Sequence, residues 1–136
     1  MINRHESYVA EEVFRILKSG GHFITQQCGG YGGIDLIEWC KGAGTVTPID
    51  WTAAVASRQL KDAGFQVTNA QEVYPEYSFL DVGAVVYYLR AVPWHVEDFS
   101  IDRYRDRLLA IHQHIQKYSR FPVKDQRFLI EATRQA

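Results

Sequence analysis

The segment SYVAEEVFRILKSGGHFITQQ constrains the fold most, because its pattern changes from helical to strand-like at a fixed point. Apolar residues recur every three or four positions from Tyr8 to Ser19, which predicts an amphipathic helix with Ser7 as its N-cap. Gly20 and Gly21 end this helix, since glycine adopts the left-handed conformation without strain. HFITQQC then predicts a strand covered on both faces, because it does not alternate cleanly. This order of elements is typical of an α/β sheet.

The rest of the chain continues the alternation of helices and strands. IDLIEWCK predicts a short helix, the segment from about Trp51 to Asp62 a longer one, and Phe65–Val73 an alternating strand. DVGAVVYYLRAVPW is strand-like in composition but helical in spacing, and the spacing favours a helix capped by Asp81. SIDRYRDRLLAIHQHIQKYS predicts a helix capped by Ser100 with Tyr118 on its buried face, and RFPV and QRFLIEATR predict strands. The result is an α/β fold with about three strands and flanking helices.

Length and composition exclude several classes of protein. The 136 residues, 46% hydrophobic and 23% charged, fit a single globular domain over residues 1–136. The net charge of -1 provides no basic field, so a nucleic-acid partner is not expected. No apolar run approaches the ~20 residues of a membrane span, and the first residues are polar. We therefore expect a cytoplasmic protein with no membrane partner.

The two cysteines, Cys28 and Cys40, do not follow any zinc-binding spacing, so no metal site is expected. We interpret them as reduced, partly buried thiols. A disulfide between them and a reactive thiol remain the alternatives.

The helix, the double glycine and the strand together resemble a known family. EVFRILKSGGHFITQQ is similar to the helix–turn–strand that leads into the fifth strand of class I S-adenosylmethionine-dependent methyltransferases. AGF before the strand at Phe65 and RFLIEA near the C-terminus resemble the family's last two strands. Residues 81–120 resemble a helical insertion before the last strand in one bacterial branch. The resemblance covers the whole chain but only the C-terminal half of the family fold.

The resemblance implies a fold, a cofactor and a missing part. It implies a Rossmann-like sheet of which this chain keeps strands five, seven and six, with the last strand antiparallel to its neighbours. S-adenosylmethionine would be the cofactor of the complete enzyme. The glycine-rich cofactor loop and the acidic ribose-binding residue have no counterpart here, since GGYGG follows the wrong strand. We therefore expect no cofactor-binding residues and no activity in this chain alone.

The resemblance also predicts a partner surface. The outer edge of strand 22–28 would lie where the family's fourth strand pairs, and only Met1 and Ile2 could remain of that strand. An unpaired apolar edge recruits another chain. We expect a second copy of this chain, giving a homodimer, or the missing N-terminal half, to cover this edge.

The NRHES segment would lie just beyond the fourth strand, beside the substrate cleft. His5 is a weak candidate for a catalytic base, and Glu6 could orient it or bind a substrate amine. Asn3 and Arg4 could bind polar groups of the substrate. The alternative is that these residues are solvated charges and polar caps ahead of a helix.

Two further pairs are candidates for substrate binding. Gln26 and Gln27 end a strand where open α/β sheets bind ligands, and one of these amides could contact substrate. They could equally satisfy backbone groups of the loop. Tyr88 and Trp94 could form an aromatic wall of the site or belong to the core.

Two functional hypotheses follow. The first is methyl transfer from S-adenosylmethionine to a small molecule or an RNA base by the complete enzyme, with this chain inactive alone. The second is a non-catalytic, truncated substrate-side module that self-associates through an exposed strand edge.

Overall fold

The computed structural model describes residues 1–135, which form two compact units. The sheet unit consists of residues 1–32, 48–75 and 125–135, and the helical unit consists of residues 33–47 and 76–124. Each unit is described by itself below. The prediction of a single domain stays a prediction. Within residues 1–135, no helix is both long enough and apolar enough to cross a membrane.

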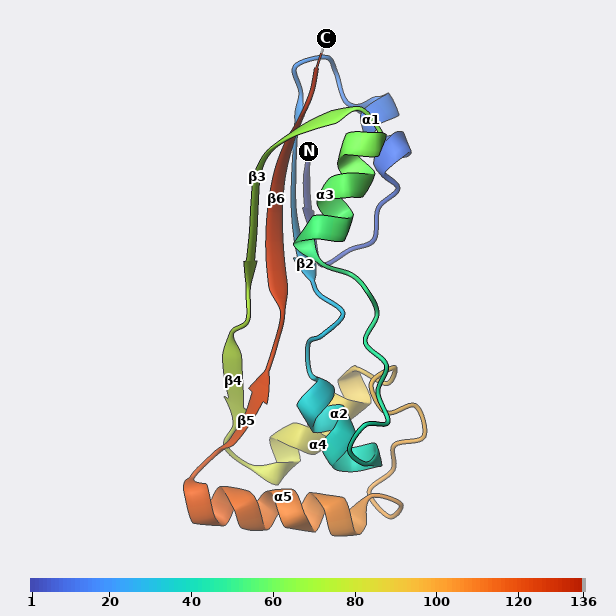
Figure 1. The fold of residues 1–136 in the computed structure, drawn as a ribbon. Helices are drawn as coiled ribbons and strands as arrows, with labels where there is room; N and C mark the ends of the chain where they lie inside the picture. Colours follow the sequence, from blue (N-terminus) through green and yellow to red (C-terminus); the bar gives the residue numbers. More distant parts are fainter. Residues whose placement is uncertain (136) are drawn as a thin grey trace. The chain divides into compact units, whose positions relative to one another are not determined.

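Four strands build the sheet unit: β1 (Ile2–Arg4), β2 (His22–Cys28), β3 (Phe65–Val73) and β6 (Arg127–Arg134). Their order is β1-β2-β6-β3, with β1 parallel to β2 and β6 antiparallel to both of its neighbours (Figure 1). This confirms the mixed α/β sheet. The predicted number of about three strands was too low, because β1 pairs with residues 24–26 of β2 and so covers part of an edge that was expected to be bare.

The helices α1 (Ala10–Ile16) and α3 (Ala53–Asp62) lie on the same side of this sheet (Figure 1). The predicted cap at Ser7 was wrong: α1 starts after Val9, which makes no side-chain cap, and Ser7 instead donates its N–H to the Glu6 carboxylate. In α3, Thr52 is the cap, since its hydroxyl accepts the Val55 N–H at 3.3 Å. Helix α1 thus begins two residues later than predicted, and Ser7 lies outside it.

A β-bulge in β3 reverses the predicted alternation of its side chains. The register shifts between Val67 and Asn69. Val67 pairs with Ala132 on the face covered by the helices, whereas Asn69 pairs with Glu131 on the opposite face. As a result, Glu72 points to the helix side, where its carboxylate accepts the N–H of the first residue of α3 at 2.7 Å.

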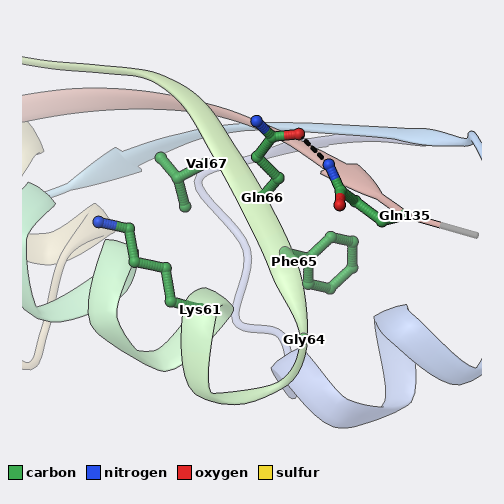
Figure 2. Close-up of a pocket in the computed structure, with 6 residues that line it drawn as sticks. All are labelled: Lys61, Gly64, Phe65, Gln66, Val67 and Gln135. Carbon is green, nitrogen blue, oxygen red and sulfur yellow. Dashed lines mark hydrogen bonds between the residues drawn. The ribbon is translucent and has the colours of Figure 1, made fainter.

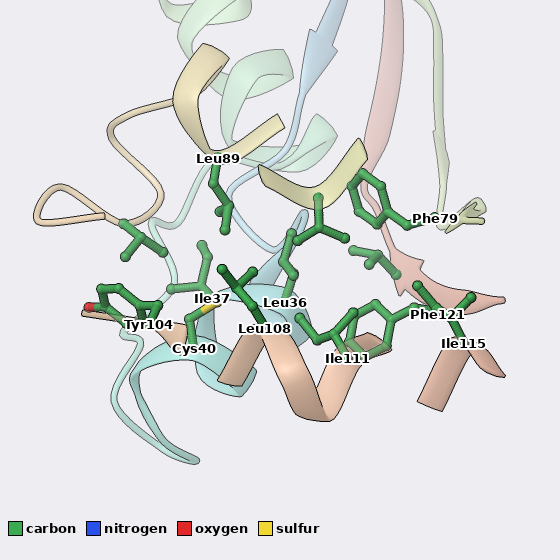
Figure 3. Packing of buried hydrophobic residues seen from close by; sticks show 13 residues of the cluster. Leu36, Ile37, Cys40, Phe79, Leu89, Tyr104, Leu108, Ile111, Ile115 and Phe121 are labelled. Atoms are coloured by element: carbon green, nitrogen blue, oxygen red, sulfur yellow. The ribbon is translucent and has the colours of Figure 1, made fainter. Parts of the chain in front are cut away.

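The helical unit contains α2 (Ile34–Lys41), α4 (Val82–Ala91) and α5 (Arg105–Tyr118), with the antiparallel strands β4 (Glu76–Phe79) and β5 (Phe121–Lys124). The pair β4–β5 forms a separate two-stranded sheet, and β4 was not predicted. Apolar side chains from α2, α4, α5, β4 and β5 form the core of the helical unit (Figure 3).

Caps explain where the helices of this unit begin. Asp81 caps α4 as predicted, because its carboxylate accepts the Ala84 N–H at 2.8 Å. Ser100 does not cap α5: its hydroxyl accepts the Arg103 N–H and closes a separate turn ahead of the helix. Tyr118 was expected to be buried, but 55% of it is exposed at the end of α5.

Candidate functional site

A pocket of about 380 Å³ lies in the sheet unit, where β1 and β2 end. Because these strands are parallel, both carboxyl ends reach the same edge, which is where open α/β sheets bind ligands. The pocket is lined by His5, Glu6, Ser7, Tyr8, Gln27, Cys28, Trp51 and Gln59. Three of the predicted site residues, His5, Glu6 and Gln27, therefore line one pocket.

The amide of Gln27 forms the centre of a polar network at this pocket. Its Nε2 donates to Asn3 Oδ1 at 2.7 Å, to Thr25 Oγ1 at 2.8 Å and to the backbone oxygen of Glu6 at 3.0 Å. Thr25 Oγ1 in turn donates to Asn3 Oδ1 at 2.9 Å. Gln27 and Thr25 are both buried, so this network fixes the end of β2 to β1 and to the segment that follows β1.

The register of β1 and β2 separates the predicted substrate-binding residues. Asn3 pairs with Thr25 and lies on the helix side of the sheet, where it positions Gln27 and does not line the pocket. Arg4 pairs with Gln26 and lies on the opposite face, because side chains alternate along a strand. Arg4 and Gln26 are thus not brought to this pocket.

His5 adopts a left-handed backbone conformation, with φ of 54°. A residue other than glycine seldom takes this conformation, and such residues concentrate at functional sites. The His5 N–H donates to the Gln26 backbone oxygen at 2.8 Å, which prolongs the β1–β2 ladder by one bond. Burial, and then the charges of Arg127 and Arg4, lower the pKa of His5 below its usual 6.5. The imidazole is therefore neutral at pH 7 and can accept a proton.

Two aromatic side chains that were not predicted as site residues form a wall of the pocket. The ring of Tyr8 lies 6.2 Å from that of Trp51 and meets the buried Phe23 edge-on at 5.1 Å. Burial raises the pKa of Tyr8 to about 12, and its hydroxyl has no hydrogen-bond partner among residues 1–135. Trp51 directly precedes Thr52, the cap of α3, and its place at the start of a predicted helix was the available signal in the sequence.

Cys28 also lines the pocket, and its thiol is free, as is the buried thiol of Cys40. Burial raises the pKa of Cys28, so its thiol stays protonated near neutral pH. Within residues 1–135, no three His, Cys, Asp or Glu side chains are grouped so that they could hold a metal ion.

Tyr88 and Trp94 belong to the helical unit. The Tyr88 ring packs against Phe79 at 5.5 Å, and its hydroxyl lies 3.4 Å from Nδ1 of His95. Trp94 is 70% exposed, with its ring 6.4 Å from that of His95. Tyr88 thus contributes to packing within its own unit, and a substrate role for both residues stays a prediction.

The GGYGG loop does not provide a cradle for a cofactor. Gly29 N–H donates to the Gln126 backbone oxygen, Gly30 N–H to the Trp51 backbone oxygen, and Tyr31 N–H to the Gln126 side chain. A Cβ on Gly30 would lie 1.8 Å from the oxygen of Ile49, so protein atoms already fill the space beside the loop. Phosphate- and cofactor-binding loops need free N–H groups and open space. These residues therefore do not fit S-adenosylmethionine.

A second pocket of about 420 Å³ lies at the other end of the sheet (Figure 2). It is lined by Lys61, Gly64, Phe65, Gln66, Val67 and Gln135, and the side chains of Gln66 and Gln135 are hydrogen-bonded to each other. Phe65 pairs with Arg134 beside the amino end of β2. Because ligands of open α/β sheets bind at the carboxyl ends, this pocket is the weaker candidate.

Solved structures similar to this chain were found by structure comparison. A proposed methyltransferase of Bacillus halodurans C-125 aligns with 99% of this chain and 63% of its own length, with a TM-score of 0.59 and 11% identity. The YcgJ protein of Bacillus subtilis has a TM-score of 0.48 at 12% identity, over 99% of this chain and 64% of its own. A phosphoethanolamine N-methyltransferase 2 of Haemonchus contortus, in complex with S-adenosyl-L-methionine, has a TM-score of 0.41 at 15% identity, over 99% of this chain and 33% of its own.

The first of these similarities shows the fold alone: the chain has a methyltransferase-like α/β fold with a mixed sheet and flanking helices. The chain spans about 63% of the length of that structure. No protein-family model matches the sequence, and no curated protein matches it.

Proposed function

We propose that this chain is the acceptor-side part of an S-adenosylmethionine-dependent methyltransferase and holds a small-molecule or RNA-base methyl acceptor in the pocket beside His5 and Gln27. The observation that supports this most is the position of the pocket. It lies at the carboxyl ends of the two parallel strands of a methyltransferase-like sheet, where this architecture binds its ligands.

The residues of the pocket have separate roles in this proposal. Neutral His5 accepts the proton that the acceptor loses, because its pKa lies below the usual value. Gln27 and Glu6 hold the acceptor through their oxygen atoms. Asn3 acts as a positioning residue, since it contacts the Gln27 amide and does not line the pocket.

This chain alone supplies no cofactor-binding loop in the proposal, because the N–H groups of GGYGG are used within the protein. Isothermal titration of the chain with S-adenosylhomocysteine measures this directly. We expect no binding heat. A dissociation constant in the micromolar range would contradict this part of the proposal.

Methyl transfer is tested by co-expressing the chain with the sequence encoded immediately upstream of it. We expect a complex that binds S-adenosylhomocysteine and transfers a radiolabelled methyl group to a pool of small molecules or RNA. His5→Ala should lower the rate at least about tenfold, as loss of a general base does. The control is His112→Ala, an exposed histidine in the helical unit. A complex that binds S-adenosylhomocysteine without transferring label would sink the proposal.

A second candidate, the self-associating module, is favoured by the edge position of β1. This three-residue strand pairs only with β2 among the described strands, and Ile2 is 82% exposed. Parallel or antiparallel pairing of two such edges would give a homodimer at strands β1 and β2. Light scattering should then report a dimer that Ile2→Lys dissociates, whereas Val73→Lys on the opposite edge strand does not. A wild-type monomer at high concentration would exclude this candidate.

A further inference from the structure

The charges around the pocket limit the ligands that it can hold. Among its eight lining residues, Glu6 supplies a carboxylate, and none is a lysine or an arginine. The pKa of His5 lies below its usual value, so the imidazole adds no charge at pH 7. Arg127 lies near His5, but Asp125 binds it in an ion pair of 2.6 Å, and Arg4 lies on the other face of the sheet. A pocket of this charge disfavours phosphates and carboxylates.

The Gln27 amide adds an acceptor that lacks a donor. Its Nε2 has two hydrogens, and three acceptors already surround it, one of which is the backbone oxygen of Glu6. Because a backbone carbonyl can only accept, Nε2 must face Glu6, and this settles the orientation of the amide. The other end, Oε1, receives no hydrogen bond from any residue among 1–135. Gln27 lines the pocket, and its Oε1 is not among the buried unpaired atoms of residues 1–135, so this oxygen is open to an N–H donor of a ligand.

The remaining wall is aromatic. Trp51 and Tyr8 line the pocket, and their rings lie 6.2 Å apart. Aromatic rings attract cations, and tryptophan does so best. They also stack on flat ligands. The pocket thus combines acceptors, one negative charge and aromatic surface.

We propose that this pocket binds the amino group of a small arylalkylamine, whose ammonium form carries a positive charge next to an aromatic ring. The N–H groups donate to Gln27 Oε1 and to the Glu6 carboxylate, and the ring of the ligand packs against Trp51. The inference rests on the proposed function in taking this amine as the methyl acceptor. The binding itself requires no cofactor, so it is measurable on this chain alone.

The test compares three ligands that share a ring and differ in charge: benzylamine, benzyl alcohol and benzoate. Each is titrated into ¹⁵N-labelled protein, and two-dimensional NMR follows the side-chain amide of Gln27 and the indole N–H of Trp51. We expect benzylamine to shift both signals with a millimolar dissociation constant, as fits a ligand of its size. Benzyl alcohol should bind more weakly, and benzoate should cause no shift.

Two variants locate the binding. Glu6→Gln removes the charge and should weaken benzylamine about threefold, the effect expected of an exposed ion pair. Trp51→Leu should weaken it by a similar factor of about three, through the lost cation–π contact. Glu97→Gln removes one exposed carboxylate in the helical unit and should change nothing. Heteronuclear spectra of each variant confirm that it is folded.

Three outcomes would each overturn the inference. Benzoate could bind as tightly as benzylamine, or the Glu6→Gln variant could bind benzylamine like the wild type. The third outcome is that benzylamine shifts only signals of residues outside the pocket. The proposed function fails separately. Amine binding without methyl transfer in the co-expressed complex contradicts the function and leaves the amine site standing. Methyl transfer to a hydroxyl or carbon acceptor, without amine binding, overturns the amine site and leaves the function standing.

Discussion

The two units of this chain bury different kinds of side chain. Among residues 1–135, the buried polar or charged residues are Thr25, Gln27, Asp125 and Gln126, and all four lie in the sheet unit. The large core of the helical unit is apolar and includes Leu36, Leu89 and Ile115 (Figure 3). The Tyr104 hydroxyl at its edge donates to Asp98 at 2.7 Å. A buried polar group is costly unless it is bonded, and the Gln27 amide meets this condition through hydrogen bonds to Asn3 and Thr25.

The pockets of the two units differ in the same way. The pocket beside His5 and Gln27 carries hydrogen-bonding groups on most sides. In the helical unit, a groove of about 340 Å³ is mainly apolar, and it is lined by Val82, Val86, Ile101, Arg105, Leu108, Leu109 and His112. Polar networks specify geometry more than they add stability. The sheet unit is thus built for positioning groups and the helical unit for packing.

Truncating the cores should have the largest effect and should be similar in the two units. Phe23 in the sheet unit is 0% exposed, and Leu89 in the helical unit is 1% exposed. Phe23→Ala should lower the free energy of unfolding by about 3–5 kcal/mol, and Leu89→Ala by about 2–5 kcal/mol, because each leaves a cavity. Urea unfolding measures both. Tyr87→Ala, at a residue 78% exposed, is the control and should cost under about 0.5 kcal/mol.

The comparison predicts a second effect that has no counterpart in the helical unit. Gln27→Leu removes the donor shared by Asn3, Thr25 and Glu6, so it should cost about 1–3 kcal/mol. Gln26→Leu, the adjacent glutamine on the opposite face, is the matched control and should stay within about 0.5 kcal/mol. If both variants lost the same free energy of unfolding in urea, the network around Gln27 would not distinguish the sheet unit.

This pair of glutamines also shows how far the sequence could predict the site. Composition and position placed Gln26 and Gln27 at the end of a strand, and that was right. The register of β1 against β2 decides whether Gln26 or Gln27 points to the pocket. This register pairs residues more than twenty positions apart. Local patterns carry no such information, so Arg4 and Gln26 were grouped with Asn3 and Gln27 although the sheet separates them.

Long periodic segments were predicted well, and short or non-local features were not. α2 matched IDLIEWCK, and β3 matched Phe65–Val73, because periodicity and flanking glycines act locally. The three-residue strand β1, the strand β4 and the bulge after Val67 depend on partners distant in sequence. Trp51 was missed as a site residue for the same reason, since a helix and a loop from other parts of the chain complete its pocket.

The helix caps offer a matched test between the units with a smaller effect. Asp81 caps α4 with a bond of 2.8 Å, and Thr52 caps α3 with a longer bond of 3.3 Å. Asp81→Ala should cost about 1 kcal/mol, and Thr52→Ala should cost less, because the longer bond is weaker and threonine caps less well than aspartate. Urea unfolding compares them. A larger loss for Thr52→Ala would mean that the start of α3, beside Trp51, contributes more than its cap.

We expect the smallest effect from Glu72, whose ionisation should make the free energy of unfolding of the sheet unit depend on pH. The Ala53 N–H, and then the Tyr74 hydroxyl, donate to this carboxylate at 2.7 Å each and lower its pKa below the usual 4.5. Because the pKa is lower in the folded state, the ionised carboxylate contributes its full share to the free energy of unfolding above the unfolded-state pKa. This share is lost as pH falls through the folded-state pKa. In the helical unit, the Tyr104 hydroxyl, together with Arg103, lowers the pKa of Asp98 below 3.8 in the same sense.

Urea unfolding between pH 7 and pH 3 measures both carboxylates. Glu72→Gln should be less stable than the wild type at pH 7, and the difference should shrink as pH falls below about 4.5. Asp98→Asn should behave alike, but its difference should persist to lower pH, because its loss begins below about 3.8. Glu72 also holds the first N–H of α3, whereas Asp98 bonds the Tyr104 side chain, so Glu72→Gln should have the larger effect at pH 7. If Glu72→Gln kept its full difference at pH 3, the carboxylate charge would not be what anchors α3.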